Sequence, residues 1–199
     1  VAVSLKKNAI HVGHSTGGNV MLRVIRKHRW FEKAIVCSPL LGLLYGGWPR
    51  PLAATLVFAA NSLGLGWLFL PGQMRQPMGR ADFERTPLTS DRWRWHRDSG
   101  ILEDAPQLGL GGPTFAWLRA ARRSIASLQR AGRSRFHAPV LILASGFDRV
   151  VDNDAIRTLV RRTPGVALCF VPDAKHEILS EADIYRRQFF AAFESFVSG

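Results

Sequence analysis

The feature that most constrains this chain is a serine set between two glycines, Gly13-His-Ser-Thr-Gly17, at the junction of two expected elements. Residues 8–13 are apolar enough for a buried strand, and residues 16–28 repeat apolar side chains at helical spacing. A G-x-S-x-G segment in this setting forms a sharp turn that holds the serine hydroxyl clear of the sheet. Both glycines are expected to let the neighbouring chain come close. Ser15 is therefore a candidate nucleophile.

Strand and helix patterns alternate on both sides of a long central stretch. Residues 33–39 form a second apolar run, which ends at a proline. Further on, strands are expected over 139–145 and 166–171, and helices over 152–162 and 181–197. A strand, a helix and a second strand in succession indicate a parallel sheet. We therefore predict an α/β fold in which a parallel sheet of four strands is flanked by helices.

The central stretch, residues 40–138, is rich in Gly, Pro, Trp and Phe and shows no strand pattern. We predict that it is a helical cap inserted between two core segments, residues 1–39 and 139–199. Residues 51–74 carry no charge, and that length could span a bilayer. Glycines and a proline interrupt the run, however, and it lies between two halves of one sheet. We expect paired apolar helices that cover a pocket there, with a membrane-spanning helix as the alternative.

A serine hydroxyl is a weak nucleophile until a base removes its proton, so a histidine and an orienting carboxylate should follow Ser15. Asp148 comes just after the strand expected over 139–145, and His176 comes just after the strand expected over 166–171. Asp152 and Asp154 lie close to the acid position, but they begin a helix, where a carboxylate is ordinarily a cap. The order serine, aspartate, histidine therefore predicts a catalytic triad.

The remaining histidines fit the role of base less well, because none follows a late strand: His11, His14, His28, His96 and His137. The backbone N–H of Thr16 begins the expected helix after Ser15. Since a helix N-terminus favours negative charge, this N–H is the candidate donor to an oxyanion.

Five segments, residues 13–19, 88–91, 111–118, 147–151 and 175–181, together resemble the bacterial lysophospholipase and monoacylglycerol lipase branch of the α/β-hydrolases, which is similar to the serine aminopeptidase S33 group. The similarity covers nearly the whole chain. It implies hydrolysis of a single acyl ester on a glycerol-based lipid through an acyl-serine intermediate. Ser15 would be the nucleophile, Asp148 the acid and His176 the base, and no metal or cofactor would be needed.

The resemblance also implies that the cap lies over a pocket for the acyl chain. The expected substrate-binding or membrane-facing residues are His14, Trp48, Phe58, Trp67 and Phe69. Peptidase and acyltransferase activities use the same triad and remain open. Epoxide and haloalkane hydrolysis are disfavoured, because those enzymes have a carboxylate at the position of Ser15.

The sequence departs from the family in one respect. In that family the nucleophile follows several earlier strands and a loop that supplies a second oxyanion donor, often in an HG-type motif, and neither precedes Ser15 here. We expect this chain to lack the N-terminal part of the fold. The alternative function is then a truncated, catalytically weak remnant that binds lipid or membrane.

The formal net charge of +12 comes largely from arginines, six of which crowd one short stretch: Arg119, Arg122, Arg123, Arg130, Arg133 and Arg135. Three interpretations of this stretch are open: it binds nucleic-acid phosphates, it binds anionic lipid, or it is a solvated basic helix with no such partner. No helix-turn-helix, zinc-finger or RNA-binding pattern accompanies it. The expected partners are therefore a small lipid ester substrate and the surface of an anionic membrane, and not nucleic acid.

Two features of the sequence predict the cellular compartment of the protein. Cys37 and Cys169 each lie in an apolar run, which predicts buried thiols rather than a disulfide framework. The first residues contain no apolar core long enough for a secretory signal. We expect a cytoplasmic protein that makes peripheral contact with the inner face of the membrane.

Overall fold

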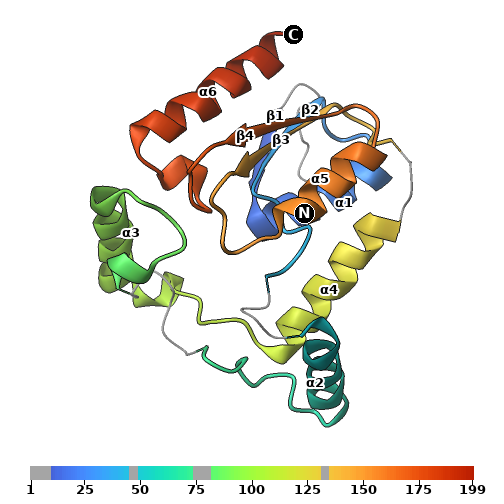
Figure 1. Cartoon of the computed structure of the whole chain (residues 1–199), viewed down its shortest axis with the longest axis vertical. Helices are drawn as coiled ribbons and strands as arrows, with labels where there is room; N and C mark the ends of the chain where they lie inside the picture. The colour runs from blue at the N-terminus through green and yellow to red at the C-terminus, as the bar shows by residue number, and fades with distance from the viewer. Residues whose placement is uncertain (1–9, 45–48, 74–81, 131–134) are drawn as a thin grey trace.

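The computed structural model describes residues 10–44, 49–73, 82–130 and 135–199, and a four-stranded parallel sheet lies at its centre (Figure 1). The strand order follows the chain: β1 (Ile10–His14), β2 (Lys33–Cys37), β3 (Val140–Ser145) and β4 (Val166–Val171). Each strand pairs with the next, so that Val12 lies opposite Ile35 and Ile142 opposite Leu168. The predicted parallel sheet of four strands is confirmed. Residues 8 and 9, which the prediction included in the first strand, lie outside the described residues.

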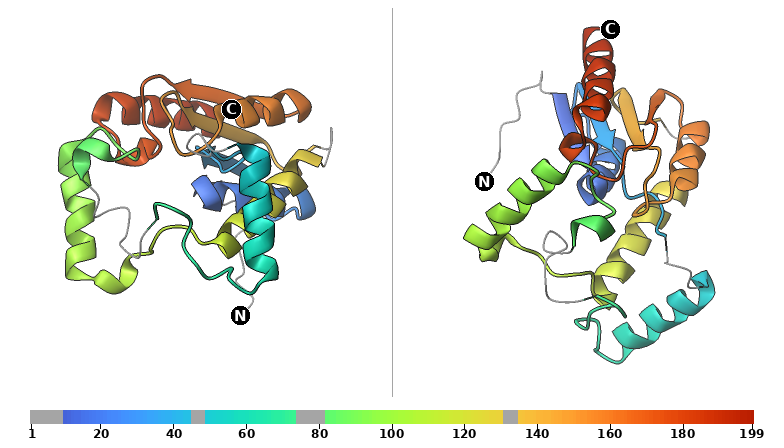
Figure 2. Two further views of the ribbon diagram at one scale, coloured as in Figure 1. Left: turned by 60° about the horizontal axis from the view of Figure 1, so that its bottom comes forward. Right: turned by 60° about the vertical axis from the view of Figure 1, so that its left-hand side comes forward.

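Helices cover both faces of the sheet (Figures 1 and 2). One face packs against α1 (Ser15–Lys27), α4 (Phe115–Arg130) and α5 (Asn153–Arg162), and the other packs against α6 (Asp183–Ser198). Successive side chains of a strand point to opposite faces. In β2, Val36 therefore joins the core under α1, while Ile35 and Cys37 join the core under α6. Both faces are buried, which is why the central strands are continuous apolar runs.

Between β2 and β3 the described residues form α2 (Arg50–Ser62), α3 (Arg92–Asp104), α4 and the short 3₁₀ helices η2 (Phe83–Arg85) and η3 (Pro106–Leu108). The expectation of paired helices within residues 51–74 is wrong. After α2 the chain turns at Gly64, which has φ +74°, and then forms an isolated bridge between Phe69 and Thr114. The helix that pairs with α2 is α4, from later in the sequence. Among the described residues, no helix has the length and apolarity needed to cross a membrane.

The α4 helix belongs to the core as well as to the insertion. Its buried side chains recur at helical spacing, and Ile125 and Leu128 pack in the same cluster as Val140 and Ile142 of β3. The amphipathic pattern of this helix thus faces the sheet, while Arg119 and Arg123 point to solvent. The last part of the predicted cap segment, residues 40–138, therefore also closes the hydrophobic core.

The loops that follow β3 and β4 approach each other closely. Gly146 N–H donates to the carbonyl of Val171 at 2.8 Å, and Phe147 N–H donates to the carbonyl of Ala174 at 3.0 Å. A Cβ at Gly146 would lie 3.0 Å from Cα of Pro172 and 3.1 Å from N of Asp173. These are backbone atoms, so a side chain at this position requires the two loops to separate.

Replacement of Gly146 by alanine should destabilise the protein by about 1–3 kcal/mol, the usual cost of overpacking. The matched control is Gly100→Ala in the interior of α3, where a Cβ would meet no atom within 4 Å among the described residues. That change should raise stability by about 0.5–1 kcal/mol, because alanine favours the helix. Urea unfolding of both variants checks this pair. Equal stability of the two variants would contradict the close approach of the loops.

Candidate active site

The turn at Ser15 joins β1 directly to α1, since the strand ends at His14 and the helix begins at the serine. Ser15 has φ 49°, in the left-handed region that residues with a side chain rarely adopt. Strain of this kind costs about 1–3 kcal/mol and is concentrated at functional sites. The carbonyl of Ser15 accepts a hydrogen bond from Leu40 N–H at 3.0 Å, which ties the turn to the segment after β2.

The glycines around this turn have unequal steric roles. A Cβ at Gly13 would lie 2.7 Å from Cε of Met21, and a Cβ at Gly18 would lie 3.2 Å from Cβ of Pro39. A Cβ at Gly17 would meet no described atom within 4 Å. The expectation that Gly17 permits close packing is therefore wrong, because this residue is exposed on the outer side of α1. Gly18, one position later and buried, is the glycine that the packing requires.

Asp148 and His176 come together at the carboxyl end of the sheet. His176 Nδ1 and Asp148 Oδ2 lie 2.8 Å apart, and the two side chains are 4% and 0% exposed. Asp148 Oδ1 accepts hydrogen bonds from the N–H groups of Val150 and Val151 at 2.8 and 3.0 Å. Burial by itself raises the pKa of Asp148, but the hydrogen bond to His176 and these N–H groups outweigh it and hold the pKa below its usual value. The carboxylate is thus ready to orient the imidazole.

The serine turn approaches this pair through His14, the residue before Ser15. Within the part of the chain that the structure describes, no hydrogen bond joins Ser15 Oγ to His176; the contact runs instead through the neighbouring His14. The centroids of the His14 and His176 rings are 4.7 Å apart. Because the bond from Nδ1 of His176 goes to Asp148, its Nε2 is the nitrogen left for the serine. Contacts between a nucleophile and its base are often loose without substrate.

Three polar side chains at the ends of β1, β2 and β3 gather around the backbone carbonyl of His176. His14 Nε2 lies 3.2 Å from this oxygen, and Ser145 Oγ donates to it at 3.4 Å. Ser38 Oγ in turn lies 2.8 Å from Ser145 Oγ, in a buried pair. Burial, together with the nearby imidazole of His176, lowers the pKa of His14. A neutral His14 with its proton on Nε2 can donate to the carbonyl, so its ring supports the histidine loop.

Thr16 is exposed in the first turn of α1. The first N–H groups of a helix have no acceptor within the helix, and they form the positive end of its dipole. This N–H can therefore donate to negative charge that develops beside Ser15, in keeping with its predicted role.

The predicted substrate-binding residues do not gather in one place. Trp48 lies outside the described residues. Phe58 and Trp67 are 73% and 71% exposed, and Phe69 is half-buried beside Thr114. An apolar cavity of about 400 Å³ lies instead between α2 and the start of α4, and its lining includes Leu43, Leu44, Leu56, Val57, Phe115 and Leu118. Its wall reaches the candidate active site through Leu43, which is bridged to Val151 in the loop of Asp148.

Sequence reasoning missed Ser38, Ser145 and Glu181. Ser145 ends a strand and Ser38 directly follows one, and the carboxyl ends of parallel strands meet at one edge of a sheet. That rule could have placed both serines beside His176. The sequence pattern places Glu181 at the start of an amphipathic helix, a position that is usually solvated, yet its side chain is fully buried. Among the residues described, no cluster of three His, Cys, Asp or Glu side chains could hold a metal ion.

The lowered pKa of Asp148 predicts a particular pH dependence of stability. In the folded protein this carboxylate keeps its charge to lower pH than in the unfolded chain. Its contribution is therefore complete above the unfolded-state pKa and is lost as the pH falls through the folded-state pKa. Asp148→Asn should be less stable than the wild type near neutral pH, and the difference should shrink in acid. Urea unfolding of both proteins between about pH 7 and about pH 3 measures it. A difference that does not change with pH would contradict the account.

Known proteins share this sequence pattern and this fold. The family model for serine aminopeptidase, S33, matches residues 2–183. A probable lysophospholipase L2 of Haemophilus influenzae is 25% identical over 189 residues, which cover 94% of this chain and 58% of the relative. The lysophospholipase L2 of Escherichia coli K12 is 28% identical over 195 residues, which cover 88% of this chain and 53% of that protein. The chain thus spans a little more than half the length of these curated relatives.

Two solved structures share the fold. A soluble variant of monoglyceride lipase from Saccharomyces cerevisiae superposes with a TM-score of 0.68 at 20% identity, covering 94% of this chain and 60% of the lipase. The monoacylglycerol lipase of Paleococcus ferrophilus also has a TM-score of 0.68, at 17% identity, with 96% of this chain and 68% of that protein covered. The fold, the strained serine turn and the match over most of the sequence lead to one conclusion: the chain belongs to the serine aminopeptidase S33 family of α/β-hydrolases.

Proposed function

We propose that this chain forms the catalytic part of a serine hydrolase that cleaves the ester of a monoacyl lipid, a lysophospholipid or a monoacylglycerol. The observation that carries the proposal is the buried Asp148–His176 hydrogen bond beside a strained serine turn. A serine nucleophile needs an imidazole base that a carboxylate holds in the correct orientation. Binding of a ligand alone does not need such a pair. In this proposal Ser15 is the nucleophile, His176 the base and Asp148 the acid.

In the first half-reaction, Ser15 Oγ attacks the carbonyl carbon of the ester while its proton passes to Nε2 of His176. The imidazolium that forms is stabilised by the Asp148 carboxylate at 2.8 Å. Negative charge on the former carbonyl oxygen is stabilised by the N–H of Thr16 and the N-terminus of α1. The carbon–oxygen bond to the glycerol then breaks, and His176 returns its proton to the departing oxygen.

In the second half-reaction, a water molecule attacks the acyl-serine. His176 takes a proton from this water and gives it to Ser15 Oγ as the acyl bond breaks. A free fatty acid leaves, and the three side chains return to their starting protonation states. No step requires a group beyond the protein and water.

The choice of a monoacyl lipid rests on the pocket and on the relatives. The cavity between α2 and α4 is lined by aliphatic and aromatic side chains, and it adjoins the loop of Asp148 through Leu43. Such a lining favours one hydrocarbon chain. The relatives are named for the hydrolysis of lysophospholipids and monoglycerides. Because the family is named for a serine aminopeptidase, an aminoacyl-anilide belongs in the assay as a competing substrate.

Removal of the nucleophile tests the proposal. Ser15→Ala, in the protein that carries this chain, should lose nearly all hydrolysis of lysophosphatidylcholine and monoolein, measured as released fatty acid. His176→Ala should be about equally damaging, and the double variant little worse, because the members of a triad act as a unit. Undiminished hydrolysis by Ser15→Ala would exclude the mechanism. A folded wild type with no turnover of either lipid would favour a lipid-binding remnant, and preference for the anilide would favour a peptidase.

We further propose that the protein is cytoplasmic and meets an anionic membrane through the insertion. Phe58 of α2 and Trp67 just after it expose apolar surface at the end of the molecule that is opposite α6 (Figures 1 and 2). The exposed Arg119 and Arg123 lie on α4, the helix that pairs with α2. Exposed aromatic side chains on and just after one helix, with exposed basic side chains on its partner helix, suit an interface between lipid headgroups and water.

Co-sedimentation with vesicles that contain phosphatidylglycerol tests this contact. The double variant Phe58→Ser/Trp67→Ser should bind on the order of tenfold more weakly, because two apolar side chains no longer enter the bilayer surface. The matched control is Ile184→Ser, at an exposed apolar side chain of α6. It should bind like the wild type. Binding of the wild type should also fall as salt rises, since the attraction of arginines to anionic lipid is screened. Binding that does not depend on salt would contradict the electrostatic part of the proposal.

A further inference from the structure

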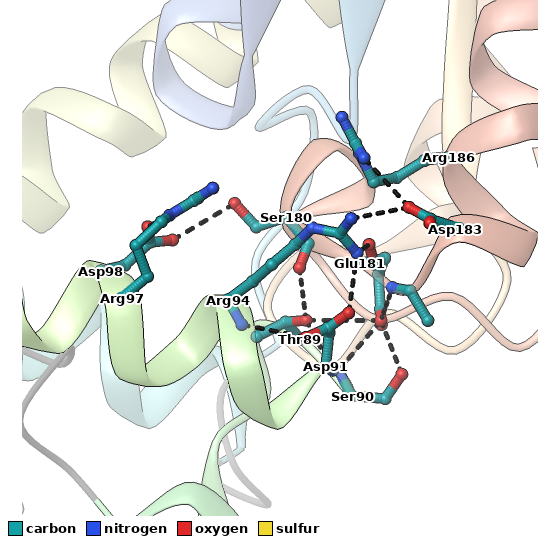
Figure 3. A network of polar contacts seen from close by, with 11 residues as sticks. Thr89, Ser90, Asp91, Arg94, Arg97, Asp98, Ser180, Glu181, Asp183 and Arg186 are labelled. Carbon is teal, nitrogen blue, oxygen red and sulfur yellow. Dashed lines mark hydrogen bonds and ion pairs between the residues drawn. The ribbon is translucent and has the colours of Figure 1, made fainter.

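The carboxylate of Glu181 is fully buried just before α6, five residues after His176 (Figure 3). It accepts hydrogen bonds on both oxygens. Oε1 accepts from the N–H of Lys175 at 2.8 Å. Oε2 accepts from Ser90 N–H at 3.0 Å, Ser90 Oγ at 2.6 Å, Thr89 Oγ1 at 3.4 Å and Ala182 N–H at 3.1 Å. A buried carboxylate is costly unless its oxygens are satisfied, and here each oxygen has a partner.

The two oxygens join different parts of the chain. Oε1 faces Lys175, the residue immediately before His176, whereas Oε2 faces Thr89 and Ser90 of the insertion. No other part of the proposed mechanism uses Glu181. One side chain therefore connects the loop that carries the candidate base to a segment that lies almost ninety residues earlier.

The same two segments are joined by the backbone as well. His176 N–H donates to the carbonyl of Pro87 at 3.3 Å, and Glu177 N–H donates to the carbonyl of Leu88 at 2.8 Å. The ammonium group of Lys175 donates to the carbonyls of Thr86 and Thr89 at 3.0 and 3.2 Å. The segment from Thr86 to Ser90 thus forms one wall against which the histidine loop is held.

On the solvent side of this wall, Arg94 of α3 links the wall to the start of α6. Arg94 donates to the backbone carbonyl of Glu181 at 2.6 Å, and it pairs with Asp91 at 2.7 Å and Asp183 at 2.6 Å (Figure 3). The carboxylate of Asp183 is 61% exposed and also pairs with Arg186, so it belongs to the outer, solvated layer. Glu181 belongs to the inner layer, one hydrogen bond from the backbone of the histidine loop.

We propose that Glu181 is a positioning residue for His176: its carboxylate fixes the backbone at Lys175 against residues 86–90 and thereby aims the imidazole at Asp148 and Ser15. This proposal rests on the proposed function, in which His176 is the base. It makes the insertion a structural support of the triad as well as a wall of the pocket.

The substitution Glu181→Gln tests the proposal at one contact. An amide has an acceptor oxygen at one end and an N–H₂ donor at the other. The oxygen will face the donors now bound by Oε2, chiefly Ser90 N–H, Ser90 Oγ and Ala182 N–H, which leaves the N–H₂ group opposite the N–H of Lys175. Two donors then face each other beside His176, so the loop should shift while the contacts on the insertion side survive. Asp183→Asn is the matched control, because it makes the same chemical change two residues later without touching Lys175.

Two readouts separate positioning from a merely structural role. The first is kcat for monoacyl ester hydrolysis, together with the rate at which a fluorophosphonate labels Ser15. Glu181→Gln should lower both by on the order of ten- to a hundredfold, the effect of a small misplacement of a catalytic group, while KM stays nearly unchanged. The second is the low-field ¹H NMR resonance of the proton between His176 Nδ1 and Asp148, which should shift or broaden. Asp183→Asn should resemble the wild type in both.

The possible outcomes are distinguishable. A folded Glu181→Gln protein with wild-type kcat, labelling rate and NMR resonance overturns the proposal. A wild type that neither hydrolyses esters nor reacts with the fluorophosphonate overturns the proposed function, whereas the NMR resonance still reports on Glu181. If Glu181→Gln does not fold, Ser90→Ala decides, because it removes the shortest hydrogen bond to Oε2 and leaves the carboxylate itself in place. It should show the same changes to a smaller degree, and wild-type values for both readouts would overturn the proposal.

Discussion

The hydrogen bond between His176 and Asp148 is the interaction on which the arrangement of this end of the sheet depends. It is buried, so the cost of desolvating the carboxylate must be offset by well-placed partners, and Val150 and Val151 supply them. It also requires two loops from neighbouring strands to lie close together, which is possible because Gly146 has no side chain between them. The backbone carbonyl of His176 is held in turn by His14 at the end of β1 and Ser145 at the end of β3. The Asp148–His176 pair thus lies where the carboxyl ends of the strands meet.

The insertion supports this centre as much as it covers it. Its last helix, α4, packs on the sheet and contributes Ile125 and Leu128 to the core. Its middle segment, residues 86–90, holds the histidine loop through Glu181 and Lys175. The part around α2 stands away from the sheet (Figure 1), and it bears the exposed aromatic side chains Phe58 and Trp67. Under the proposed function, support of the triad and access of a lipid therefore fall to different parts of one insertion.

Much of the fold and the centre of the site could be predicted from sequence, because both depend on local patterns. Apolar runs and helical spacing located the four strands, and the G-x-S-x-G turn with the later Asp148 and His176 followed from their places after strands. What failed depends on contacts between distant segments. Gly17 and Gly18 are adjacent, and only the packing of α1 on Pro39 shows which of them needs to be glycine. Glu181 has the pattern of a solvated helix start, and only the fold brings Ser90 and Lys175 to its carboxylate.

The central claim is that Ser15 carries the acyl group during turnover. The most direct measurement is to mix the protein with a monoacyl lipid, quench the reaction in acid within its first turnovers, and locate the acyl group by peptide mass spectrometry. The account predicts an added acyl mass on the peptide that contains Ser15, and no such mass on the corresponding peptide of Ser15→Ala. Turnover of the lipid with no acyl adduct on Ser15, or with an adduct on another residue, would contradict it.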